Sequence, residues 1–125
     1  MSIELRYLHT EEVPAALEAL HLEKDAGEYQ YLAAFDENHH VVGVTIIYAN
    51  LSMDNMHIES LDVSEKARGH GVATAMLEVL YAQAGRAHKV VTTNGFTAKG
   101  QQHLVHVMNR LGQQHHVATT QIGRC

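Results

Sequence analysis

Residues 68–73, with the sequence Arg-Gly-His-Gly-Val-Ala, join a strand-like pattern to a helix-like pattern, and this junction limits how the chain can fold. The preceding residues 56–63 mainly alternate apolar and polar side chains, which predicts a strand. Residues 74–81 have the composition and spacing of a helix. Glycines in such a turn let backbone amides approach a phosphate, and the helix N-terminus then holds the negative charge. The sequence therefore predicts an α/β fold with an anion-binding turn.

The spacing Arg-x-x-Gly-x-Ala in this turn resembles the (Gln/Arg)-x-x-Gly-x-(Gly/Ala) signature of the GNAT N-acetyltransferase superfamily. In that family the loop holds the pyrophosphate of acetyl-CoA. Glu59, Leu61 and Val63 stand nine, seven and five residues before Arg68, a register that is frequent on the family's central strand. The resemblance is good over residues 56–112, and the N-terminal half follows it only in the order of its elements.

Size and composition predict one domain spanning residues 1–125, since 46% of its 125 residues are hydrophobic. No apolar run approaches the roughly 18 residues of a membrane span, and residues 1–8 have no apolar signal-peptide segment. The single cysteine, Cys125, excludes an internal disulfide and fits a reducing compartment. We therefore expect a cytoplasmic protein without a membrane partner.

The charges are divided between the two halves of the chain. Residues 1–63 contain two basic and twelve acidic residues, whereas residues 64–125 contain seven basic and two acidic residues. The basic half suits a polyanionic cosubstrate, and the acidic half suits a cationic acceptor such as an amine. No basic stripe interleaved with aromatic residues is present, so we expect no nucleic-acid partner. The sequence leaves a homodimer open.

Eleven histidines are a high number for this length. The pairs His39-His40 and His115-His116 are expected in loops, and His103-x-x-His106 fits one helix face. A zinc site needs a third ligand at a suitable spacing, and no cysteine partner exists. We therefore expect exposed polar histidines and no metal.

The hydrophobic patterns predict the order β-α-β-β-β-α-β-α-β. The expected strands are residues 3–8, 29–35, 41–48, 56–63, 89–93 and 117–122. Thr10 is expected to cap the first helix, and Gly85 and Gly112 to end the second and third. The resemblance implies a single-domain GNAT-like fold with a mixed, mostly antiparallel central sheet, splayed strands and flanking helices. The family's customary seventh strand has no counterpart.

Amine acetylation requires the amine to lose a proton before it attacks the thioester. A lysine-like amine has a pKa of about 10.4, so its deprotonation at pH 7 costs roughly 4.6 kcal/mol. A base is therefore expected, and Glu59 matches the position of a catalytic or water-ordering Glu in the family. The alternative is that Glu59 is a paired structural residue or lies on the other sheet face. Counting by two places His57 on the same face, as a reserve base.

The resemblance also implies which residues contact acetyl-CoA, the expected cosubstrate. Backbone groups after Glu59 would pair with the pantetheine arm as an added strand does, and the glycine turn would hold the pyrophosphate. Counting by two also places Leu61 and Val63 on the face of Glu59. The expected contact residues are Leu61, Asp62, Val63, Arg68, Gly69, His70, Gly71, Val72, Ala73, Thr74 and Asn94.

The general acid that protonates the leaving thiolate is missing from its usual place. Relatives often use a Tyr four residues before a Gly-Phe pair, but Met108 and Gly112-Gln113 occupy these positions here. Gln101 replaces the Asn that usually opens that helix. Tyr81 lies on the other predicted helix, and the resemblance assigns it no role. A catalytically weak module that binds CoA or a protein partner is therefore the alternative to an N-acetyltransferase. A polyamine, an antibiotic, a protein N-terminus and a lysine all remain open as the acceptor.

Overall fold

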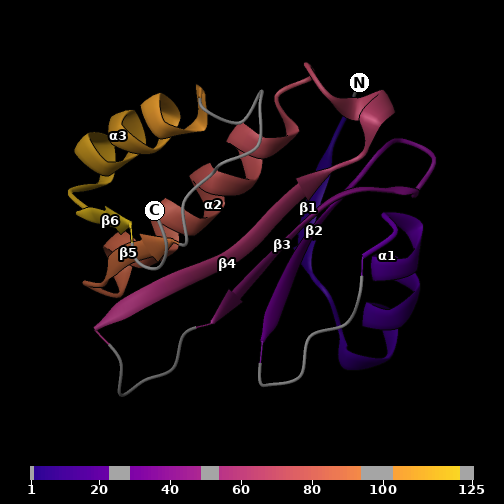
Figure 1. Ribbon diagram of the computed structural model, residues 1–125, viewed down its shortest axis with the longest axis horizontal. Coiled ribbons are helices and arrows are strands. Elements are labelled where there is room, and N and C mark those ends of the chain that lie inside the picture. Colours follow the sequence, from indigo (N-terminus) through magenta and orange to yellow (C-terminus); the bar gives the residue numbers. More distant parts are fainter. Residues whose placement is uncertain (1, 23–28, 49–53, 94–102, 122–125) are drawn as a thin grey trace.

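One six-stranded sheet runs through the computed structural model, which describes residues 2–22, 29–48, 54–93 and 103–121 (Figure 1). The strands follow the order of the sequence. They are β1 (Glu4–Tyr7), β2 (Gln30–Phe35), β3 (Val41–Tyr48), β4 (Asn55–Val63), β5 (Val90–Thr93) and β6 (Thr119–Gln121). The pairings from β1 to β4 are antiparallel, and the pairings of β4 with β5 and of β5 with β6 are parallel. The predicted mixed, mostly antiparallel sheet is confirmed.

Helices cover the two faces of this sheet. On one face lies α1 (Val13–Ala19), and on the other lie α2 (Val72–Arg86) and α3 (His103–His115). Short 3-10 turns at Thr10–Glu12 and Glu65–Ala67 precede α1 and α2. The predicted order of helices and strands is therefore confirmed, and Figure 1 shows α1 separated from α2 by the strands.

Two apolar cores result from these layers. The apolar helical stripe Val13, Ala16 and Leu17 is buried against β2 and β3. The larger core joins α2 and α3 to the opposite sheet face; its fully buried side chains include Leu32, Ile47, Ile58, Leu77, Leu80, Tyr81, Leu104 and Leu111. Each buried aliphatic side chain of this size stabilises the fold by about 1.5–3 kcal/mol. The larger core therefore fixes the start of α2 relative to β4.

The glycine-stop prediction for α2 and α3 is wrong. Both glycines lie inside their helices, because α2 continues to Arg86 and α3 to His115. A Cβ on Gly85 would lie 3.0 Å from the carbonyl oxygen of His115, and a Cβ on Gly112 would lie 2.6 Å from that of Val117. These glycines permit close packing between α2 and the end of α3.

Four histidines adopt the left-handed backbone conformation, in which glycine or asparagine is usually found. His21, His88 and His116 follow the three helices, and His39 lies in the β2–β3 hairpin; their φ angles are 58°, 57°, 58° and 64°. All four side chains are exposed. His is among the few non-glycine residues enriched in this conformation. Local backbone geometry thus accounts for part of the high histidine content, and no group of residues suited to a metal is found in the described parts of the chain.

The first helix begins differently from the Thr10 prediction. Thr10 lies within the 3-10 turn, and His9 precedes it as the capping residue. The His9 N–H donates to Glu12 Oε1 at 2.9 Å, and the Arg6 guanidinium donates to both Glu12 oxygens at 2.9 and 2.8 Å. These bonds, with that from Arg6 the largest cause, lower the pKa of Glu12 from 4.5 to about 2. Within the described ranges, no helix has the length and apolar content needed to cross a membrane.

Candidate functional site

Part of strand β4, at the centre of the sheet, has a described neighbouring strand on one side only. It pairs with β3 from His57, opposite Tyr48, to Val63, opposite Gly43. On its other side it pairs with β5 only as far as Ile58, opposite Thr93. Beyond that point no described strand covers the β5-facing edge of β4, and Figure 1 shows β4 running on beside α2. Residues 59–63 therefore present an edge to which an extended ligand can add.

A β-bulge in β4 changes the direction of the side chains at Glu59. Ile46 pairs with Ser60, whereas Ile47 pairs with Ile58, so Glu59 is the extra residue. Ile58 and Leu61 consequently point into the same core, although they are three positions apart, an odd spacing that places residues of a regular strand on opposite faces. The prediction that Glu59 shares the face of Leu61 and Val63 is therefore wrong, because counting by two fails across a bulge.

Leu61 and Val63 behave as core residues. Leu61 is buried, and Val63 packs against the same cluster as α2. Their backbone groups, in contrast, belong to the part of β4 that extends beyond β5. The side chains of these residues therefore pack in the core, while their backbone groups lie beyond the pairing with β5.

The turn between β4 and α2 has the backbone shape of an anion cradle. Gly69 and Gly71 adopt left-handed φ angles of 83° and 79°. A Cβ built on either glycine meets no atom within 4 Å, so the space above them is open. The first bond at the start of α2 runs from the Ala75 N–H to Gly71 O at 3.0 Å. The N–H groups of residues 72–74 have no backbone acceptor among the described residues, and they coincide with the positive end of the helix dipole.

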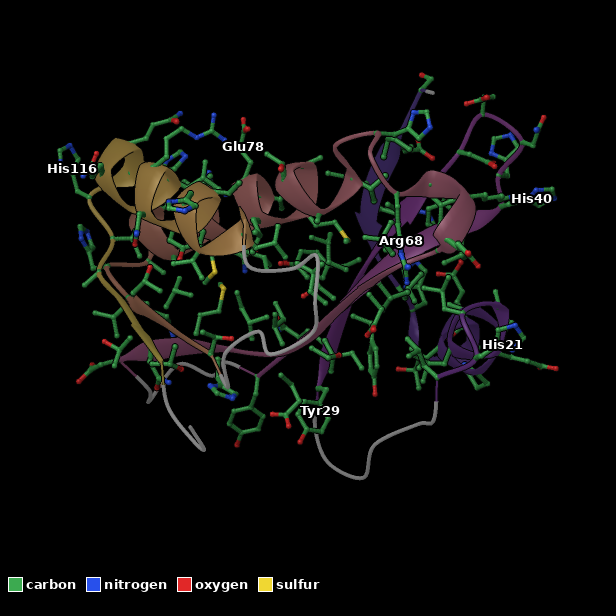
Figure 2. All side chains as sticks on the ribbon, turned by 45° about the horizontal axis from the view of Figure 1, so that its top comes forward. His21, Tyr29, His40, Arg68, Glu78 and His116 are labelled. Carbon is green, nitrogen blue, oxygen red and sulfur yellow. The ribbon has the colours of Figure 1, made fainter. Side chains whose placement is uncertain are left out.

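Two opposite charges flank this turn. Burial raises the pKa of Asp62 on β4, and the nearby charge of Arg68 opposes that rise. Figure 2 places Arg68 at the turn itself, beside the strands. An arginine there can pair with a phosphate oxygen.

Glu59 is linked to a chain of polar side chains. Its Oε2 lies 3.5 Å from His57 Nε2, and His57 Nδ1 lies 2.8 Å from Thr92 Oγ1. Asn55 Nδ2 donates to the same Thr92 oxygen at 2.9 Å. The prediction that His57 and Glu59 lie on the same side of the strand is therefore confirmed.

Aromatic side chains lie next to this chain of polar groups. Tyr48 on β3 is the register partner of His57, so the two side chains stand on the same sheet face. The Tyr29 ring packs edge-on against Tyr48, with 6.0 Å between the ring centroids. Figure 2 shows Tyr29 among other side chains beside the strands. No sequence motif marked Tyr29, Tyr48 or Thr92, because their proximity to Glu59 depends on strand register.

The structure provides no tyrosine at the usual place of the general acid. Met108 is buried in α3 and is 3% exposed. Tyr81 is fully buried, and its hydroxyl lies 2.5 Å from Thr119 Oγ1, which ties α2 to β6. Burial raises the pKa of Tyr81, while the Thr119 bond opposes the rise. Asn94 and Gln101 lie outside the described residues.

Comparisons with known proteins identify the family and the fold of this chain. The family model described as the Acetyltransferase (GNAT) family matches residues 2–113. A search of curated proteins finds no match. Solved structures that share the fold include the following two. One is an aminoglycoside acetyltransferase from an uncultured soil metagenomic sample, with 21% identity, a TM-score of 0.68, and 90% of this chain and 91% of that chain covered. The other is the ribosomal-protein-S18-alanine N-acetyltransferase from Escherichia coli, with 13% identity, a TM-score of 0.69, and 89% and 77% covered.

Proposed function

Because the chain belongs to the acetyltransferase (GNAT) family, we propose that it transfers an acetyl group directly from acetyl-CoA to an amine. The observation that best supports this proposal is that two candidate binding features, the edge of β4 and the glycine turn, adjoin each other. The part of β4 beyond its pairing with β5 leads into the glycine turn, where added Cβ atoms on Gly69 and Gly71 would meet open space. An extended arm with a pyrophosphate at its end has the shape and charge that such a surface binds.

The residues after Glu59 and in the turn would hold acetyl-CoA. Backbone groups of Leu61, Asp62 and Val63 lie on the β4 edge and can pair with the amides of a pantetheine arm. The turn from Arg68 to Thr74, which includes His70 and Ala73, can bind the pyrophosphate through backbone N–H groups, with Arg68 supplying positive charge. Asn94 stays a predicted contact. Acetyl-CoA itself supplies the activated thioester.

Glu59 is the proposed base. It would accept a proton from the ammonium form of the acceptor, and the neutral nitrogen would then attack the thioester carbonyl carbon. An amide bond forms as the nitrogen loses a second proton to solvent, the carbon–sulfur bond breaks, and CoA leaves as a thiolate. With Met108 buried at the usual tyrosine position, water or another residue would protonate that thiolate.

The acceptor is proposed to be a positively charged amine. The aromatic pair Tyr29–Tyr48 and the Glu59 carboxylate offer a cation both ring surfaces and a negative charge. The acidic excess of residues 1–63 would favour the encounter, an effect screened beyond about 8–10 Å at physiological salt. The titles of the similar structures name aminoglycosides and a ribosomal-protein alanine, which both carry amines.

A panel of amines with acetyl-CoA tests this proposal, with CoA release as the signal. Polyamines, aminoglycosides, lysine derivatives and peptides with free N-termini would be compared with neutral and anionic amines. The kcat/KM of the best acceptor should fall as salt rises, while kcat should change much less. A second measurement, calorimetric binding of acetyl-CoA, distinguishes an active N-acetyltransferase from the alternative, a catalytically weak binding module. That alternative predicts tight binding of acetyl-CoA but no release of CoA with any amine.

A further inference from the structure

We propose that His57 is a positioning residue that orients the Glu59 carboxylate, and that Thr92 and Asn55 fix the His57 ring. The inference rests on the proposed function, because it names the residues that hold Glu59, the proposed base, in position to take a proton from the acceptor. It assigns a role to three residues on β4 and β5 that surround the point where these strands separate.

The bulge creates the need for such support. Glu59 is the extra residue between two register pairs, and it lies one residue beyond Ile58, the last residue of β4 that pairs with β5. A base must keep its carboxylate within a fraction of an ångström of the productive position. The Glu59 side chain is 34% exposed, so packing restrains it less than it restrains the core residues. The neighbouring His57, only 17% exposed and 3.5 Å away, can add such a restraint.

The donor and acceptor groups of these side chains indicate which one donates each hydrogen bond. An ionised carboxylate can only accept, so the neutral imidazole of His57 would carry its proton on Nε2, which is the nitrogen 3.5 Å from Glu59 Oε2. Nδ1 would then accept the hydroxyl hydrogen of Thr92, while Thr92 Oγ1 accepts from Asn55 Nδ2. The neutral ring thus faces the carboxylate with a donor.

The same geometry argues against His57 as the base itself. One ring nitrogen is engaged by Thr92 and the other is directed at Glu59. Neither nitrogen lone pair is then available to an incoming amine. The reserve-base hypothesis is therefore replaced by an indirect role, in which His57 acts on the acceptor only through Glu59.

Thr92 offers a well-matched pair of variants. Thr92→Val removes the hydroxyl but keeps the branched shape of a 5% exposed strand residue, whereas Thr92→Ser keeps the hydroxyl. Nitrogen-15 NMR of the imidazoles tests the geometry without substrate, with His57 assigned from the signals lost in His57→Gln. The wild type and Thr92→Ser should show an Nε2–H tautomer with a hydrogen-bonded Nδ1. In Thr92→Val the Nδ1 shift should move toward that of a free acceptor nitrogen. A proton on Nδ1 in the wild type, or an Nδ1 shift that is the same in Thr92→Val, overturns the proposal.

A double-mutant cycle with Glu59→Gln tests the link to turnover. Thr92→Val should lower kcat about tenfold, as expected for a displaced catalytic group, and should leave the acetyl-CoA KM unchanged. Thr92→Ser should restore kcat. In the Glu59→Gln background, Thr92→Val should cause no further loss, because there is no base left to position. Equal losses in both backgrounds would make Thr92 structural and overturn this inference alone. If Glu59→Gln itself leaves kcat unchanged, the proposed base and this inference both fall.

Discussion

Tyr48 stands directly opposite His57 across the β3–β4 ladder, so an aromatic ring and the His57–Glu59 pair share one side of the sheet. Tyr29 extends this aromatic surface from the start of β2. The acceptor is thus expected to meet a ring face next to the carboxylate that takes its proton. This relationship gives the first prediction.

Tyr48→Ala should raise the KM of a cationic acceptor while leaving the acetyl-CoA KM unchanged. A cation–π contact of about 0.5–2 kcal/mol corresponds to a rise of roughly 2- to 30-fold. Steady-state kinetics with each substrate varied in turn measure the effect. Tyr48→Phe keeps the ring and serves as the control, with an acceptor KM close to that of the wild type. An equal KM in the alanine variant would exclude Tyr48 from the acceptor site.

Gly71→Leu should abolish acetyl-CoA binding, because the side chain would enter the open space above the turn. The left-handed φ of 79° also adds strain of about 1–2 kcal/mol for any L-residue. Calorimetry with acetyl-CoA measures the affinity, and circular dichroism verifies the fold.

His88→Leu is the matched control for the Gly71 variant. His88 has a φ of 57° beyond the opposite end of α2, so leucine there bears similar backbone strain away from the turn. This variant should bind acetyl-CoA like the wild type. Unchanged affinity in a folded Gly71→Leu variant would refute the phosphate-binding role of the turn.

Glu59→Gln should lower kcat at neutral pH by about 100-fold or more, the usual size of a general-base contribution. The acetyl-CoA KM should change little. The defect should shrink as pH rises, because solution then supplies the deprotonated amine without a base. Full pH–rate profiles of both proteins provide the measurement. A defect of constant size from neutral to alkaline pH would indicate a structural or electrostatic role instead.

Glu12→Gln should lower the thermal midpoint at neutral pH and lose this effect in acid. The folded-state pKa of Glu12 is about 2, below its ordinary value of 4.5, mainly because Arg6 binds the carboxylate. A lowered folded pKa stabilises the fold above the unfolded pKa, and the contribution disappears as pH falls from about 4.5 to about 2. Thermal unfolding of both proteins between pH 7 and pH 2 measures the difference. Glu11→Gln, one residue earlier in the same turn, is the control and should show no such pH-dependent difference.

Local patterns in the sequence predicted most of the fold. The apolar stripe of α1 and the alternation in the strands determined the order of elements, because burial on one face repeats with the period of each structure. The turn at residues 68–73 was recognisable because its glycines have a physical task, namely the left-handed φ angles of Gly69 and Gly71.

Features that depend on distant contacts could not be predicted in this way. Gly85 resembles a helix stop in the sequence, but it lies inside α2 and leaves room for the carbonyl oxygen of His115, which only the folded packing brings near. The bulge at Glu59 is visible only from the register with β3. The contacts of His57 with Thr92 likewise depend on the pairing of β4 with β5, whose partners lie 35 residues apart.

The central claim is that this chain acetylates an amine with acetyl-CoA bound along β4 and the glycine turn. The most direct measurement is amine-dependent release of CoA by the purified protein, with the acetylated product identified by mass spectrometry. The account predicts release and an acetylated amine with at least one cationic acceptor, and the loss of both in Gly71→Leu. Binding of acetyl-CoA without release for any amine in the panel, or transfer that persists unchanged in Gly71→Leu, would contradict it.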